Sequence, residues 1–158
     1  MNLLFVRHGK DSDQHRGGWS QLDLLPEGKR EAKTLADYLV QHKEDYHFTK
    51  MITSDLKRAE TTATILAETL QLPLEKESSL RETNNGDLAG MLNSGADQKF
   101  PRLYFRSLAM DEHYPNGESP REFYQRIKTW FQRFLQENNN SDETQIVVTH
   151  GGVINIIY

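Results

Sequence analysis

Two short apolar runs, one near each end of the chain, each lead to a histidine that is followed by glycine. The first reads LLFVRHG from Leu3, and the second reads IVVTHGG from Ile146. Uninterrupted apolar runs that stop at turn-forming residues are typical of strands buried on both faces of a parallel sheet. Because ligands bind beyond the carboxyl ends of the strands in such a sheet, we expect His8 and His150 to meet in one pocket, with Arg7 beside them to bind an anion.

Between these runs, strand-like and helix-like segments alternate, which predicts an α/β layered fold. Apolar residues at helical spacing predict helices over residues 32–39 and 59–70, with a strand near residues 50–53 between them. A serine, a proline and a glutamate within residues 119–122 predict the capped start of a third helix. A bulky apolar stripe follows at helical spacing and is assigned to the core: Phe123, Ile127, Trp130, Phe131 and Phe134.

The whole chain, residues 1–158, is expected to form a single domain. An extended piece is predicted to end at Glu82. Residues 83–117 then show weak periodicity and several glycines and prolines, so we interpret them as an inserted segment with short helices that covers the carboxyl edge of the sheet. The final residues, from Ile154 to Tyr158, are mostly apolar. We therefore expect the chain to be a truncated version of a longer domain, with its carboxyl-terminal part missing.

The composition excludes several classes of function. The chain has no cysteine, which excludes disulfides, thiolate metal sites and cysteine nucleophiles. Its net charge of −4 gives no reason to expect nucleic acid as a partner. No apolar run approaches the roughly 20 residues that cross a bilayer, and the amino terminus turns polar at Arg7, too early for a signal peptide. We expect a cytoplasmic protein without a membrane partner, and the oligomeric state is left open.

A second arginine joins the predicted pocket. Arg58 lies at the start of a helix, just after a strand, so it is expected at the same sheet edge as His8 and His150. Guanidinium groups match phosphate oxygens as forked donors, and a helix start adds backbone N–H donors. Because nearby cations disfavour a protonated histidine, we expect His8 to be neutral at about pH 7 and able to accept a phosphoryl group. Such a pocket stabilises the developing charge without requiring a metal in principle.

These residues belong to motifs that follow one another along the whole chain. The motifs are Arg7-His8-Gly9, Gly18-Trp19-Ser20, Pro26-Glu27-Gly28, the stretch from Ser54 to Ala63, Leu80-Arg81-Glu82, Gly117-Glu118-Ser119 and Thr149-His150-Gly151-Gly152. In this order they resemble the motifs of the histidine phosphatase superfamily, the phosphoglycerate mutase-like group. The resemblance implies a three-layer sandwich, in which a mixed, mostly parallel sheet lies between helices on both faces.

The resemblance also implies roles for individual residues. His8 would be the phosphorylated nucleophile, and Arg7, Arg58 and His150 would form the phosphate pocket. Glu82 would donate a proton to the leaving group and then accept one from water, and a neighbouring dianionic substrate would favour its protonated form. Neither a cofactor nor a metal ion is implied.

Further substrate-binding residues are expected at Gln14, Gly18 and Gly151. The family motif continues from Arg-His-Gly with Glu-Thr and an asparagine three residues later, whereas Lys10, Asp11 and Gln14 stand at these positions. Gln14 can still donate an amide N–H to phosphate, but the two charged residues alter the pocket mouth, which bears on the identity of the substrate. The stretch after Glu82 also departs from the family's aromatic and glycine pattern.

The function predicted from these features is that of a metal-independent, histidine acid-type phosphatase acting on small phosphate monoesters through a phosphohistidine. A phosphoglycerate mutase could use the same pocket, although the known mutases of the resembled family carry a large insertion after the acid. A protein that binds phosphorylated ligands without turnover is a further alternative. The last alternative is an enzyme that removes phosphate from a phosphohistidine on another protein.

Overall fold

The computed structural model describes residues 1–138 and 142–158. In this part of the chain, four strands form one sheet in the order β1-β4-β2-β3. Their bounds are Asn2–Arg7 for β1, Phe48–Thr53 for β2, Leu74–Lys76 for β3 and Thr144–Thr149 for β4. All strand pairs within the described residues are parallel. Every residue of β4 is buried, because this strand lies between β1 and β2 and is covered on both faces, as its apolar run predicts.

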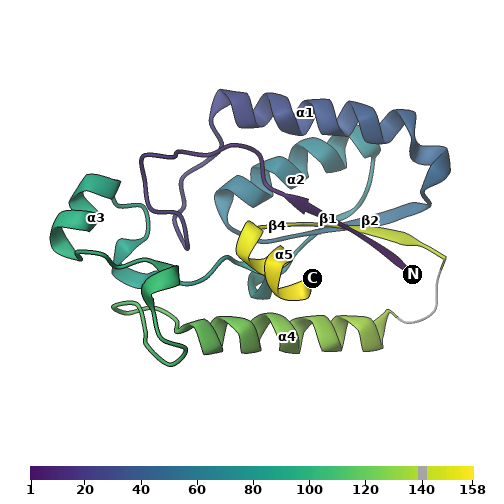
Figure 1. Ribbon diagram of the computed structural model, residues 1–158. Helices are drawn as coiled ribbons and strands as arrows, with labels where there is room; N and C mark the ends of the chain where they lie inside the picture. The colour runs from purple at the N-terminus through teal and green to yellow at the C-terminus, as the bar shows by residue number, and fades with distance from the viewer. Residues whose placement is uncertain (139–141) are drawn as a thin grey trace.

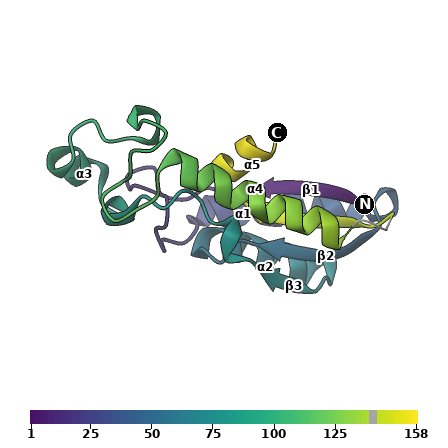
Figure 2. The ribbon, with the colours of Figure 1, turned by 90° about the horizontal axis from the view of Figure 1, so that it is seen from below.

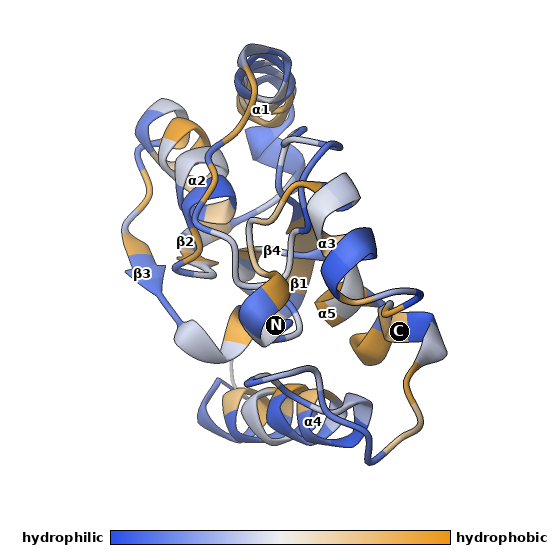
Figure 3. Cartoon of the chain, turned by 90° about the vertical axis from the view of Figure 1, so that its left-hand side faces the viewer, coloured by the Kyte–Doolittle hydropathy of each residue, from blue (hydrophilic) through white to orange (hydrophobic). Residues whose placement is uncertain are grey.

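Helices cover both faces of the sheet (Figure 1). Helices α1 (Pro26–Gln41) and α2 (Lys57–Leu70) pack on one face, and α4 (Pro120–Glu137) and α5 (Gly151–Ile157) pack on the other. Figure 3 shows the same layers from the side, with α1 and α2 above the strands and α4 below them. Figure 2 shows α5 next to β1 and α4. This arrangement confirms the predicted α/β sandwich with helices on both faces.

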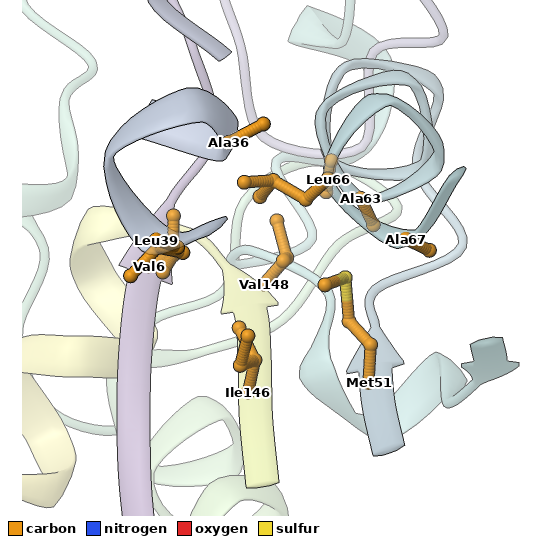
Figure 4. Close-up of a cluster of buried hydrophobic side chains, with 10 residues drawn as sticks. Val6, Ala36, Leu39, Met51, Ala63, Leu66, Ala67, Ile146 and Val148 are labelled. Atoms are coloured by element: carbon orange, nitrogen blue, oxygen red, sulfur yellow. The ribbon is translucent and has the colours of Figure 1, made fainter. Parts of the chain in front are cut away.

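Alternating side chains along the strands divide the core into two halves. In β4, Ile146 and Val148 face α1 and α2, whereas Val147 faces α4. Figure 4 shows the first half, where Val148 lies close to Leu66 of α2. The second half contains the apolar stripe of α4, as predicted, with Phe131 partly buried and the other four members buried: Phe123, Ile127, Trp130 and Phe134.

Helix α4 begins as its sequence predicts. The Ser119 hydroxyl oxygen accepts a hydrogen bond from the Glu122 N–H at 3.2 Å, and the Glu122 carboxylate accepts one from the Ser119 N–H at 3.0 Å. These two bonds satisfy backbone donors that the first turn of a helix leaves without partners. No helix in the described residues combines the length and apolarity that crossing a bilayer would require.

The extended piece that was expected to end at Glu82 is only partly a strand. Strand β3 ends at Lys76, and a 3₁₀ turn, Ser78–Leu80, follows it. The chain turns inward there because the side chain of Leu80 is fully buried in the core beneath α4. Beyond Glu82, residues 83–117 contain one short helix, α3 (Asn93–Lys99), and two 3₁₀ turns. Figure 1 shows this segment on the side toward which the strands point.

The loop after β1 packs closely on the first turn of α1, which generates a test of the fold. A Cβ atom on Gly28 would lie 2.2 Å from the carbonyl oxygen of Lys10. We predict that Gly28→Ala lowers the free energy of unfolding by about 1–3 kcal/mol, because backbone would have to shift. Gly95→Ala in α3 is the control, since the nearest atom there is 4.0 Å away. It should be neutral or stabilising by up to about 1 kcal/mol. Urea denaturation measures both, and equal midpoints would contradict the prediction.

Candidate active site

Three neighbouring strands end at one level, and each is followed by a polar side chain. His8, His150 and Ser54 are the first residues after β1, β4 and β2. Backbone hydrogen bonds keep these strand ends aligned. The His8 N–H donates to the Thr149 carbonyl and the Ser54 N–H donates to the Val148 carbonyl, both at 3.0 Å. The ring centroids of His8 and His150 lie 5.2 Å apart. The two histidines from opposite ends of the chain are therefore neighbours.

The hydrogen bonds of His8 determine which ring nitrogen carries the hydrogen. Its Nδ1 lies 2.8 Å from the carbonyl oxygen of Gly9, and since a carbonyl only accepts, Nδ1 carries the hydrogen. Nε2 accepts a bond from the Arg58 Nε–H at 3.3 Å. Burial lowers the pKa of His8 below its ordinary value of 6.5, and the charges of Arg58 and Arg7 lower that pKa further, whereas nearby carbonyl and carboxylate oxygens oppose them. The neutral ring offers a lone pair on Nε2.

His150 presents the opposite nitrogen. The ring is fully buried, and its Nε2 lies 2.8 Å from the Ser54 hydroxyl oxygen, which also accepts the Leu56 N–H at 3.3 Å. The hydroxyl hydrogen of Ser54 has no other acceptor among the described residues, so we assign Nε2 as its acceptor, which places the ring hydrogen on Nδ1. Burial, and then the charge of Arg58, hold the pKa of His150 well below its usual value. Within the described residues Nδ1 is buried and has no hydrogen-bond partner, which leaves a polar group that a ligand could satisfy.

Arg58 is oriented by backbone carbonyls. It lies in the first turn of α2 and is 3% exposed. Its Nη2 donates to the Gly18 carbonyl at 2.8 Å and its Nη1 donates to the Ser20 carbonyl at 3.1 Å. Gly18 has a φ of +56°, and a Cβ there would lie 2.0 Å from Oδ1 of Asn85, so this turn requires glycine. Gly18 was expected to bind substrate; in the structure its carbonyl group orients Arg58.

A cavity of about 410 Å³ lies at this edge of the sheet. Arg7 and His8 line this cavity, and Arg7 is exposed. Gly151 is the first residue of α5, and a Cβ there would lie 3.8 Å from Nε of Arg7. Gln14 is exposed and does not line the cavity; its carbonyl accepts the Asn93 N–H at 2.8 Å. The structure therefore does not group the Gln14 side chain with the other residues.

Glu82 meets the start of α5. Its carboxylate accepts the Thr83 N–H at 2.9 Å and the Gly152 N–H at 3.0 Å. A Cβ on Gly152 would lie 2.2 Å from Oε1 of Glu82, so glycine permits this approach. Burial lowers the pKa of Arg58, and the charges of Asp11 and Glu82 oppose that shift. Both carboxylates are therefore within electrostatic reach of the arginine.

Arg126 of α4 holds the backbone that carries Glu82. Its Nη1 donates to the carbonyls of Ser79 and Arg81 at 2.6 and 2.9 Å, and its Nη2 donates to the carbonyl of Glu82 at 3.0 Å. The same guanidinium binds both carboxylate oxygens of Glu118, at 2.7 and 2.9 Å. One side chain thus ties the segment that precedes the inserted residues to the helix that follows them.

Sequence reasoning did not identify Arg126, the Ser54 contact or the pairing of Asp11 with Arg58. A signal for Arg126 exists, because it lies three residues after Phe123 and four before Trp130, inside the apolar stripe of α4, where a charge needs partners. The other two contacts depend on the order of the strands, which no local pattern specifies. Among the described residues, no cluster of three or more histidine, aspartate or glutamate side chains is suited to a metal ion.

Comparison with known proteins gives consistent matches over nearly the whole chain. A family model of the histidine phosphatase superfamily (branch 1) matches residues 3–158. Phosphoglycerate mutase-like protein 4 of Arabidopsis thaliana is 33% identical, with 99% of this chain and 69% of that protein covered. Phosphoserine phosphatase 1 of Hydrogenobacter thermophilus is 31% identical, with 95% and 71% covered. The structure of the α-ribazole phosphatase of Shigella flexneri is similar with a TM-score of 0.82 at 25% identity, with 99% and 77% covered.

The contacts of Arg126 generate a prediction for stability. We expect Arg126→Lys to lower the free energy of unfolding by about 2–3 kcal/mol, because a single ammonium group cannot satisfy Glu118 and three carbonyls together. Arg121→Lys is the matched control on the same helix, since Arg121 pairs with Asp111 where the two side chains are 61% and 74% exposed. That pair should contribute nothing measurable. Chemical denaturation compares the two variants, and indistinguishable midpoints would refute the role of Arg126.

Proposed function

Because the chain belongs to the histidine phosphatase superfamily, we propose that it hydrolyses small phosphate monoesters through a phosphohistidine on His8, without a metal ion. The observation that carries the proposal is the environment of Nε2 of His8. This nitrogen bears the lone pair and lies 3.3 Å from the Nε of a buried arginine, Arg58, next to a cavity that reaches the ring. This geometry supports the proposal, because one phosphoryl group bound there would meet both a nucleophile and a cation.

In the first step, Nε2 of His8 attacks the phosphorus in line with the ester oxygen. The N–P bond forms while the P–O bond breaks, and Glu82 supplies a proton to the leaving oxygen. Arg58 and Arg7 stabilise the charge on the phosphoryl oxygens, and the free Nδ1–H of His150 adds a donor. The dephosphorylated alcohol then leaves.

In the second step, the Glu82 carboxylate takes a proton from a water molecule, whose oxygen attacks the phosphorus. The N–P bond breaks, inorganic phosphate leaves, and both side chains return to their starting states. The Gly9 carbonyl holds the hydrogen on Nδ1 of His8 throughout, which directs the phosphoryl group to Nε2.

Phosphoryl transfer of the mutase type is the second candidate, and the mutase-like relative favours it. Transfer and hydrolysis share the first step. They differ in whether water or the bound alcohol accepts the phosphoryl group. Residues 83–117 contain only short helices, and we propose that this small cover admits water, which favours hydrolysis. The two phosphatase relatives support the same choice.

The covalent step is tested at His8. We predict that His8→Asn lowers the rate of phosphate release from an aryl phosphate by at least about 10⁴-fold, the scale of removing a nucleophile. Parent protein quenched in base during turnover should carry one phosphoryl group on His8 by mass spectrometry. Equal rates in parent and variant would end the catalytic role of His8, and rates no faster than the reaction without protein would indicate a protein that binds phosphorylated ligands without turnover. Isomerisation of phosphoglycerate faster than phosphate release would identify a mutase.

The protonation of His8 generates a prediction for the pH dependence. We expect kcat/KM to rise with pH along an acid limb with a midpoint below 6.5, since burial and neighbouring arginines lower the pKa of His8 and only the neutral ring can attack. Activity is thus lost as the pH falls through that pKa. Asp11→Asn should move the limb to lower pH, because the charge of Asp11 raises the pKa of His8. A midpoint above 6.5, or a limb that moves upward, would contradict the assignment.

A further inference from the structure

We propose that Asp11 sets the anion affinity of this pocket: its carboxylate stands beside Arg58 where a phosphoryl group must bind, so phosphate binds only when Asp11 is displaced. The inference rests on the proposed phosphatase site and adds a residue that competes with the ligand.

Asp11 and the attacking nitrogen both lie beside Nε of Arg58. A carboxylate oxygen of Asp11 lies 3.5 Å from Nε of Arg58, and Nε2 of His8 lies 3.3 Å from the same atom. Nη1 and Nη2 of Arg58 each donate one hydrogen to a backbone carbonyl, and these bonds hold the guanidinium in place. In-line attack brings the phosphorus to within about 3–3.5 Å of the nucleophile. A phosphoryl oxygen in that position and the Asp11 carboxylate, both negatively charged, therefore compete for the space beside Nε of Arg58.

The position of Asp11 at the cavity also supports competition between its carboxylate and a bound anion. Asp11 lines the cavity of about 410 Å³, whereas Arg58 does not line it and is 3% exposed. The side chain of Asp11 is 25% exposed. Arg7 and Lys10 also line the cavity and attract an anion into it, but the Asp11 carboxylate stands beside Arg58 and must move before the anion can pair with that arginine.

Asp11 is held loosely enough to move. It lies in the irregular stretch between β1 and α1, and its distance from Arg58 exceeds the roughly 2.7–2.9 Å of a charge-assisted hydrogen bond. The backbone around it is fixed by other groups, because the Gly9 N–H donates to Thr62 and the Lys10 N–H donates to Glu31. Displacement thus requires a change of side-chain rotamer and leaves the loop in place.

Charge neutralisation adds to the steric effect. Arg7 and Arg58 bring two positive charges to the pocket, and Asp11 offsets one of them. At separations of about 4–6 Å and an effective dielectric constant of roughly 20–40, one unit charge changes the affinity for an anion by about tenfold or more.

The test is titration calorimetry with inorganic phosphate at a pH of about 8, above the ordinary titration range of histidine. Parent protein is compared with Asp11→Asn, which keeps the shape and removes the charge. We expect phosphate to bind Asp11→Asn about tenfold more tightly, or better still. Asp13→Asn removes a charge that also lines the cavity but forms no ion pair with Arg58 in the described residues. Asp37→Asn is a second control, because it removes a negative charge from the exposed face of α1, where Asp37 pairs with Lys33 at 3.3 Å.

The outcomes separate the inference from the proposed function. Unchanged affinity in Asp11→Asn, or an equal gain in Asp13→Asn or Asp37→Asn, would overturn the competition and leave the phosphatase untouched. Asp11→Thr serves as a second removal of the charge should the asparagine variant fail to fold. Phosphate binding by none of the proteins would overturn the anion site and both proposals together. Tighter binding to Asp11→Asn in a protein without turnover would keep the inference and reject the phosphatase.

Discussion

A buried guanidinium must find acceptors for its N–H groups, and around Arg58 this requirement organises the site. Its two terminal nitrogens donate to the carbonyls of Gly18 and Ser20, so the loop after β1 has to present both carbonyls to the same point. The positive φ at Gly18 and the close approach of Asn85 follow from that path. The Asn85 side chain also accepts the Trp19 N–H. One buried charge thereby joins the loop after β1 to the segment after Glu82.

The same cation gives the two histidines different chemical properties. Burial, reinforced by Arg58, keeps both rings neutral by lowering their pKa values. Their partners then differ: the Gly9 carbonyl takes the hydrogen on Nδ1 of His8, and the Ser54 hydroxyl donates to Nε2 of His150. One ring is left with a lone pair and the other with an N–H. Two identical side chains at one sheet edge thus become an acceptor of phosphorus and a donor to oxygen.

The features that the sequence predicts well have strong local signals. The capped start of α4, its aromatic stripe and the buried run of β4 each follow from residues close together in the chain. The sequence did not distinguish strand β3 from the turn at Leu80, because the turn depends on burial of Leu80 under α4, a helix that lies much later in the sequence. Gln14 was expected at the site through a motif position, yet backbone pairing with Asn93 leaves its side chain exposed. Contacts between distant segments set both outcomes.

The pairing of Asp11 with Arg58 also bears on the stability of the empty protein. Burying a cation without a counter-charge is costly, and backbone carbonyls offset only part of that cost. A carboxylate 3.5 Å away reduces the cost when no anion is bound. The same carboxylate must be displaced when a phosphoryl group arrives. The family motif that this chain resembles has an uncharged threonine at this position, whereas this chain supplies an internal anion beside the arginine. Stability of the unliganded fold and affinity for phosphate therefore oppose each other at a single side chain.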